Sequence, residues 1–189
     1  APERALFRRL AVFAGGFTLE AATAVCADRG GDPIAAAAGP RPSPALPRED
    51  VLGLLLGLVD KSLVQVEARD GEARYWLLET LRAYAREQLD RSGETAATDA
   101  AHAAYFAAWA GGPEPPAPGL PGERRAAGLP VAAVAGEVDN LRAALRCLLE
   151  RGEAGMGLGL AARIYPIWFE RGPRGRRRSS PPAFWRRPR

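Results

Sequence analysis

The stretch VLGLLLGLVDKSLVQVEARDGEARYWLLETLRAYA, residues 51–85, decides the fold of this chain. Its apolar run at 51–59 predicts a helix with leucines on nearly every side, so we expect that helix to be largely buried. Alternating residues at 62–67 and 73–78 flank the turn Asp70-Gly71 and predict a β-hairpin. A new apolar stripe then predicts a second helix at the end of the stretch.

The neighbouring segments complete a recognisable order of elements. The helix after the hairpin runs from Glu79 and stops at Ser92-Gly93. On the other side, an amphipathic helix is predicted over 2–14, and Thr18 caps a second helix that ends near Ala27. Helix, helix, helix, hairpin, helix is a winged-helix order, so we assign residues 1–93 to a winged-helix domain. Prolines, glycines and alanines at 28–48 predict a flexible insert within it.

The rest of the chain is predicted to be helical and irregular by turns, which makes the fold class mostly α with a small β-hairpin. We expect a connecting helix at 94–110, a linker at 111–135, a helical hairpin at 136–171 and a disordered Arg- and Pro-rich tail at 172–189. One helical hairpin cannot bury both of its faces. We therefore expect the apolar face of this one, with Trp168 and Phe169, to be exposed.

Charge is distributed unevenly along the chain. The net charge is +4, yet eight arginines lie between Arg171 and the end, and residues 1–170 carry 18 basic and 22 acidic groups. No apolar run approaches the ~18 residues of a membrane span, and the start lacks a signal-peptide pattern. Cys26 and Cys147 are too few for a disulfide framework. We expect a cytoplasmic protein that does not contact membranes.

The sequence contains no set of residues that is typical of an enzyme active site. The sole lysine, Lys61, is not part of a phosphate-binding loop, and the sole histidine, His102, excludes multi-histidine zinc sites. A histidine half-buried on a helix is favoured over one that activates Cys26 or Cys147. We expect no catalytic, cofactor-binding or metal-binding residue and no enzyme activity.

DNA binding is the alternative function, since winged helices commonly insert their third helix into the major groove. Here that helix, 51–59, contains no arginine or lysine, and the hairpin offers only Arg69 and Arg74 among acidic residues. We therefore expect this segment not to contact DNA directly. The two hypotheses differ in whether the third helix is basic and exposed or apolar and buried.

Several phrases of the sequence resemble one family. They are RRLAVFAGGF at 8–17, LVDKSLV at 58–64, YWLLETLRAYA at 75–85, HAAYF at 102–106 and DNLRAAL at 139–145. They look like the winged helix and the first tetratricopeptide-like helices of actinobacterial STAND-class transcriptional regulators, which often carry a LuxR-type DNA-binding domain at one end. The match covers about two-thirds of the chain.

The resemblance implies a non-catalytic signalling module. In that family an upstream NB-ARC-type NTPase domain binds ATP or ADP, and the winged helix couples its nucleotide state to helical sensor repeats. The expected partners are thus the NTPase domain and the repeats of the same protein, and no cofactor is expected in this segment. The Met-His-Asp sensor of related proteins falls on Leu77, Leu78 and Glu79, which puts direct nucleotide contact in doubt. The expected domain-interface residues are Leu78, Glu79, Arg82, Tyr84, Trp168 and Phe169.

Overall fold

A computed structural model describes residues 2–28, 45–69, 72–111 and 131–171 of the chain. The helices are α1 (Pro2–Arg9), α2 (Leu19–Cys26), α4 (Val51–Asp60), α5 (Glu79–Arg91), α6 (Thr95–Trp109), α7 (Val131–Gly136), α8 (Val138–Glu150) and α9 (Ala154–Arg171). Strands β1 (Gln65–Arg69) and β2 (Glu72–Trp76) form the only sheet among the described residues, an antiparallel pair in which Val66 faces Tyr75. The predicted class, mostly α with a small β-hairpin, is confirmed.

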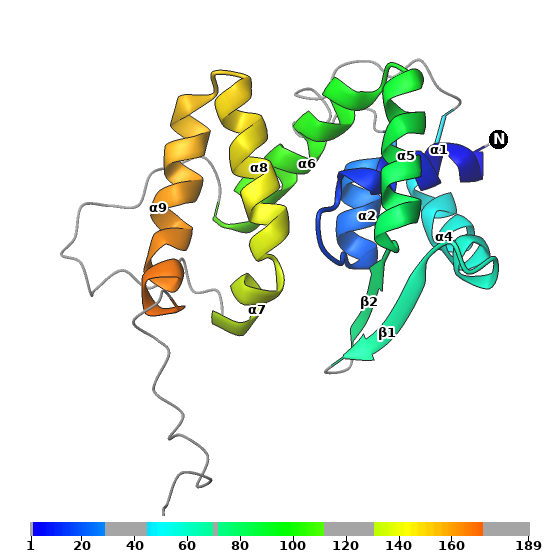
Figure 1. Cartoon of the computed structure of the whole chain (residues 1–189), viewed down its shortest axis with the longest axis horizontal. Helices are drawn as coiled ribbons and strands as arrows, with labels where there is room; N and C mark the ends of the chain where they lie inside the picture. Colours follow the sequence, from blue (N-terminus) through cyan, green and yellow to red (C-terminus); the bar gives the residue numbers. More distant parts are fainter. Residues whose placement is uncertain (1, 29–44, 70–71, 112–130, 172–189) are drawn as a thin grey trace, which may run out of the picture.

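The elements form two groups joined by one helix. Figure 1 shows α1, α2, α4, α5 and the hairpin on the right, the helices α7, α8 and α9 on the left, and α6 between them. The right-hand group has the predicted winged-helix order. No described helix is long and apolar enough to cross a bilayer.

Local sequence features fix the ends of several elements. Thr18 caps α2 by accepting a hydrogen bond from the amide of Ala21 at 3.1 Å. Gly93, with φ of 73°, follows α5 in a conformation that favours glycine. The first helix is shorter than the predicted 2–14, because the chain tightens into a 3-10 turn at Leu10–Val12 and then extends at Phe13.

The wing also contains an isolated β-bridge that periodicity did not reveal. Phe17 forms a bridge with Tyr75: each backbone N–H donates to the other residue's carbonyl at 2.8 Å. Their rings also stack with centroids 6.0 Å apart. The loop after the first helix is thereby fixed along β2.

The ends of the predicted insert lie side by side. The amide of Asp28 donates to the carbonyl of Leu46 at 2.8 Å, and the amide of Leu46 donates to the Asp28 carboxylate at 2.7 Å. Leu46 is buried, and Asp28 also accepts from Arg9 at 2.9 Å. Asp28 and Leu46 are therefore held next to each other at one point of the winged helix. Residues 29–44, like the predicted tail at 172–189, lie outside the described part.

The apolar face of the helical hairpin is covered, which corrects one expectation. Leu141, Leu148, Leu160 and Ile164 are each at most 1% exposed, because α6 packs against α8 and also touches α9. The connecting helix thus supplies the layer that the hairpin alone lacks. Trp168 and Phe169 belong to α9, but their side chains lie outside the described part of the chain.

Both groups share one continuous core. Phe13 of the winged helix lies edge-on to Phe106 of α6, with ring centroids 6.4 Å apart, and Phe106 belongs to the same buried cluster as Leu141. The predicted boundary near residue 93 therefore falls between two helices, α5 and α6, without a break in packing. The predicted linker, 111–135, lies mostly outside the described residues and ends within α7.

Candidate nucleic-acid interface

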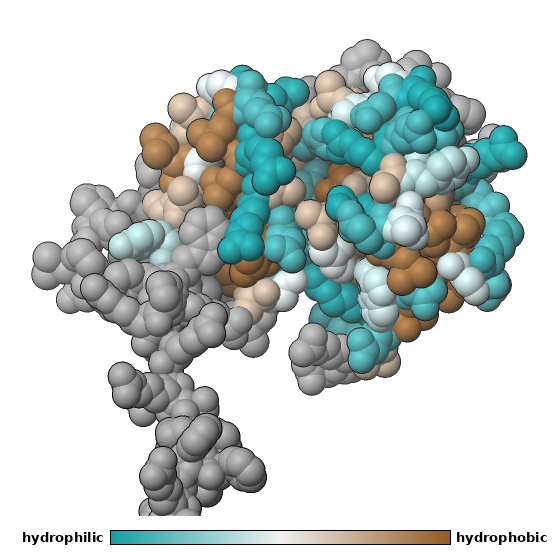
Figure 2. All heavy atoms as spheres, in the orientation of Figure 1, coloured by the Kyte–Doolittle hydropathy of each residue, from teal (hydrophilic) through white to brown (hydrophobic). Residues whose placement is uncertain are grey.

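Helix α4 occupies the position of a recognition helix, and one of its faces is open. Val51, Leu55 and Leu58 are buried toward the module, whereas Leu52 and Leu56 are 46% and 48% exposed. The expectation of a largely buried helix is therefore wrong. Helix α4 packs mainly on α1 and to a lesser extent on α2, so its outer leucines have no described element above them. Figure 2 shows hydrophobic side chains gathered at the lower right, over α4 and the start of α5.

The charges around this open face are mixed. Glu49 and Asp50 are exposed before α4, and Asp60 is exposed at its end. Two cations flank the helix: Arg48, which is exposed, and Lys61, which pairs with Glu3 of α1. An apolar face with one cation at each end can contact base methyl groups and a few phosphates, but it cannot neutralise a long run of phosphates.

The wing presents few cations to solvent. Val66, Glu67, Ala68, Glu72 and Ala73 are exposed. The guanidinium of Arg74, counted in the sequence as a wing cation, instead donates to the Gly16 carbonyl at 2.8 Å and to the Glu137 carboxylate at 2.6 Å. The Arg69 side chain lies outside the described part.

Four of the predicted domain-interface residues, Leu78, Glu79, Arg82 and Tyr84, lie at the N-cap or in the first half of α5. Leu78 is 50% exposed at the N-cap, where its side chain makes no capping hydrogen bond. Glu79 is exposed and accepts two hydrogen bonds from Arg82, at 2.7 and 3.0 Å, which hold the pKa of Glu79 below its usual value. Tyr84 is 55% exposed and its ring lies 6.4 Å from that of Phe7. Helix α9, which carries Trp168 and Phe169, lies at the opposite end of the molecule (Figure 1).

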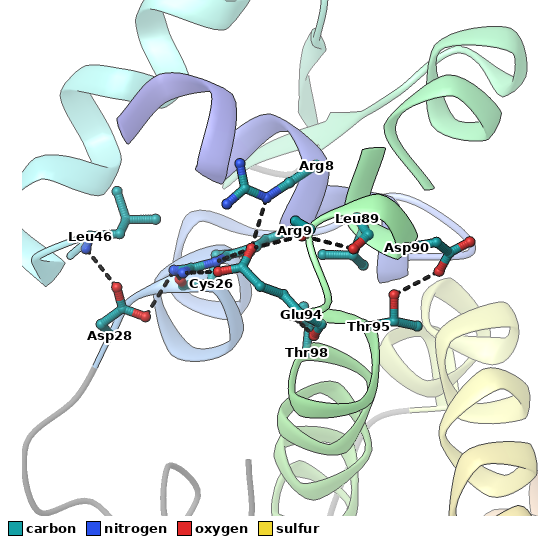
Figure 3. A network of polar contacts seen from close by, with 11 residues as sticks. Arg8, Arg9, Cys26, Asp28, Leu46, Leu89, Asp90, Glu94, Thr95 and Thr98 are labelled. Carbon is teal, nitrogen blue, oxygen red and sulfur yellow. Dashed lines mark hydrogen bonds and ion pairs between the residues drawn. The ribbon is translucent and has the colours of Figure 1, made fainter. Parts of the chain in front are cut away.

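A buried ion pair links α1 to the residue that precedes α6. The side chains of Arg9 and Glu94 are both fully buried, and their N–O distance is 2.7 Å. Arg9 also donates to the Cys26 carbonyl at 2.7 Å and to Asp28, while Arg8 donates to Glu94 at 2.7 Å (Figure 3). One guanidinium thus ties α1 to the end of α2 and to the start of α6.

The pKa values of this pair show that the partners outweigh the cost of burial. Burial alone would raise the pKa of Glu94, but hydrogen bonds from Arg9 and Arg8 lower it. Burial alone would lower the pKa of Arg9, but Glu94 and Asp28 raise it. Both groups are therefore charged at neutral pH. Sequence analysis missed this pair because the partners stand 85 residues apart.

His102 is buried in the shared core. It is 2% exposed rather than half-buried, and its ring lies 5.3 Å from that of Phe13 and 4.7 Å from that of Phe106. Burial lowers its pKa to about 4, so the imidazole is neutral at pH 7, and its Nε2 has no hydrogen-bond partner. Among the described residues no cluster of three His, Cys, Asp or Glu side chains could hold a metal ion.

Comparison with known proteins identifies long relatives. Over 169 residues the chain is 42% identical to proteins of Mycobacterium tuberculosis and Mycobacterium bovis, each named "Putative HTH-type transcriptional regulator". The alignment covers 89% of this chain but only 17% of each relative. A further M. tuberculosis protein, named only as uncharacterized, is 44% identical over 96 residues, which are 51% of this chain and 21% of the relative. No family model and no solved structure matches the chain.

These relatives correct one sequence-based expectation. We expected this segment not to contact DNA, because its third helix lacks cations. The relatives are named as helix-turn-helix regulators, which points to DNA binding and contradicts that expectation. The structure matches neither side of the earlier distinction between a basic, exposed helix and an apolar, buried one: α4 has an open face but carries no cation of its own.

Proposed function

We propose that this chain is the winged-helix segment of a DNA-binding transcriptional regulator and that α4 and the wing are its contact elements. The open outer face of α4 carries the proposal, because a recognition helix must keep one side free of its own domain. The names of the mycobacterial relatives support the same role. The role is one of binding rather than catalysis.

The composition of the face defines the kind of contact. Leu52 and Leu56 can pack on thymine methyl groups in the major groove, whereas the flanking Arg48 and Lys61 can each reach a phosphate. Two phosphate contacts give a slope of about −2 in a plot of log affinity against log salt concentration. This proposal therefore predicts a shallow salt dependence and a preference for A·T-rich sites.

The experiment is fluorescence anisotropy with labelled duplexes across a salt series. The test variant is R48E/K61E, and the control is R142E/R146E on the exposed side of α8, which changes the net charge equally. Both retain the Arg-rich segment 172–189, so its contribution to binding cancels. We expect the test variant to bind at least tenfold more weakly and to lose about two units of salt slope, and the control to bind like the parent. Equal effects of both variants, or no duplex binding, would refute the proposal.

A second function is favoured by the leucines on the same face. A face with two half-exposed leucines and no cation also suits a protein surface. We propose as the second candidate a non-catalytic signalling module of a STAND-type regulator, with ATP or ADP bound in a domain outside this chain. In that case L52E/L56E would abolish reporter activation by the complete regulator but leave its DNA affinity unchanged.

A further inference from the structure

The described residues contain one polar junction between the wing and the helical hairpin. Asn140, on α8, is fully buried and uses both ends of its amide. Its Oδ1 accepts from the amides of Ala14 and Gly15 at 3.0 and 3.4 Å, and its Nδ2 donates to the Gly16 carbonyl at 2.9 Å and to Glu137 at 2.7 Å. The hairpin thus holds the loop that follows the first helix.

Arg74 joins the same junction from β2. Its guanidinium donates to the Glu137 carboxylate at 2.6 Å and to the carbonyls of Gly16 and Gly136 at 2.8 and 2.9 Å. The Arg74 side chain is 23% exposed and that of Glu137 only 11%, so this ion pair is largely shielded from solvent. A movement of β2 away from α8 would leave Glu137 without its cation.

Gly16 makes the close approach possible. A Cβ atom at this position would lie 2.6 Å from Nε of Arg74, closer than real contacts allow, and 3.1 Å from the carbonyl oxygen of Tyr75, which is a tight contact. The next residue, Phe17, forms the two-way bridge with Tyr75. The loop is therefore fixed to β2 on one side and to α8 on the other.

We propose that Arg74, Glu137 and Asn140 form a relay that couples the position of the wing to that of the helical hairpin. A ligand or protein that shifts α8 would then move β2 and change the contact surface formed by the wing and α4. The regulatory meaning of the relay rests on the proposed function, but the coupling itself does not. Coupling of this kind is reciprocal, so a change in the wing must also reach the hairpin.

Hydrogen exchange of the full-length chain tests the relay without any DNA. The first variant, Asn140→Leu, removes the hydrogen bonds of the Asn140 side chain to Ala14, Gly15, Gly16 and Glu137 while keeping a side chain of similar size. We expect amide exchange in β1 and β2 to accelerate at least tenfold, while α2 and α4 keep the parent's rates. The control is Arg142→Ala on the same helix, since Arg142 is exposed and its bond to Asp139 is long at 3.5 Å. It should leave the wing unchanged.

The reverse variant separates coupling from a local effect. Arg74→Gln, placed in the wing, should accelerate exchange in α8 at least threefold, and Glu137→Gln should do the same in both elements if Asn140→Leu fails to fold. Acceleration confined to the mutated element, or equal in every helix, would overturn the relay. Failure of duplex binding would leave the exchange result standing, so the two proposals fail separately.

Discussion

Removing the charge of Glu94 should destabilise the whole winged helix. Glu94→Gln keeps the size of the side chain but leaves Arg9 fully buried, with Asp28 as its one remaining anionic partner among the described residues. Removing one partner of a buried ion pair costs about 3–5 kcal/mol. Because the glutamine amide oxygen can still accept hydrogen bonds from Arg9 and Arg8, we expect a loss of about 3 kcal/mol, at the lower end of this range. That is a large part of the ~5–15 kcal/mol that stabilises a typical domain.

Urea unfolding followed by far-UV circular dichroism measures this loss. With a slope of about 2 kcal/mol per molar urea, the midpoint should fall by about 1.5 M. The matched control is Glu79→Gln, because Glu79 pairs with Arg82 on the surface, where water and salt screen the pair, and its urea midpoint should stay at the parent's value. Equal midpoints for the two variants would refute the reasoning.

Acidification provides a second measurement on the same variant. The pKa of Glu94 is lowered in the folded protein, so its contribution is complete above its unfolded pKa and is lost as pH falls through the folded pKa. The difference between the parent and Glu94→Gln should therefore shrink in acid. A difference that grows as pH falls would contradict the assignment.

Three further changes have defined outcomes. The pKa of His102 is lowered to about 4 in the folded protein, so on acidification the unfolded chain takes up this proton first, and the free energy of unfolding falls by about 2.5 kcal/mol between pH 7 and about pH 4.5. His102→Leu should remove this part of the shift in urea midpoint, and an unchanged shift would contradict the buried, neutral histidine. Leu148→Ala should cost about 2–5 kcal/mol, whereas Leu149→Ala, at a position 68% exposed, should stay within about 0.5 kcal/mol; similar thermal midpoints would contradict the packing. Thr18→Ala should lower the free energy of unfolding by about 1 kcal/mol because α2 loses its cap, and Thr18→Ser should keep the parent's stability. Unchanged stability in Thr18→Ala would contradict a stabilising role of the cap.

Local patterns predicted the elements because the physics that sets them is local. Thr18 caps α2, and Gly93 follows α5 with a positive φ, as expected from residue type. The wing followed from alternation around Asp70-Gly71: toward the turn, β1 ends two residues later and β2 begins one residue earlier than the sequence predicted. These features depend on neighbours within a few positions.

Burial and polar contacts depend on partners that the sequence does not place side by side. Leucines on every side of α4 predicted a buried helix, but its main neighbours among the described elements are α1, α2 and the preceding turn, and Leu52 and Leu56 stay open. Arg74 was counted as a cation of the wing, yet its carboxylate partner lies 63 residues away on the hairpin side. The helices and strands of the candidate site could therefore be predicted from the sequence, whereas the exposure and ion pairs of its residues could be seen only in the folded structure.

The hydrogen bonds between Asp28 and Leu46 make the stretch between these two residues a suitable place to insert a foreign domain. Because Asp28 and Leu46 hold each other through two hydrogen bonds, the two ends of a segment spliced between them would be fixed side by side. A fluorescent reporter or an affinity tag whose own ends are close together could be spliced in there. The winged helix would then carry its own label at a point away from the surface of α4 and β1–β2 that the proposed function uses.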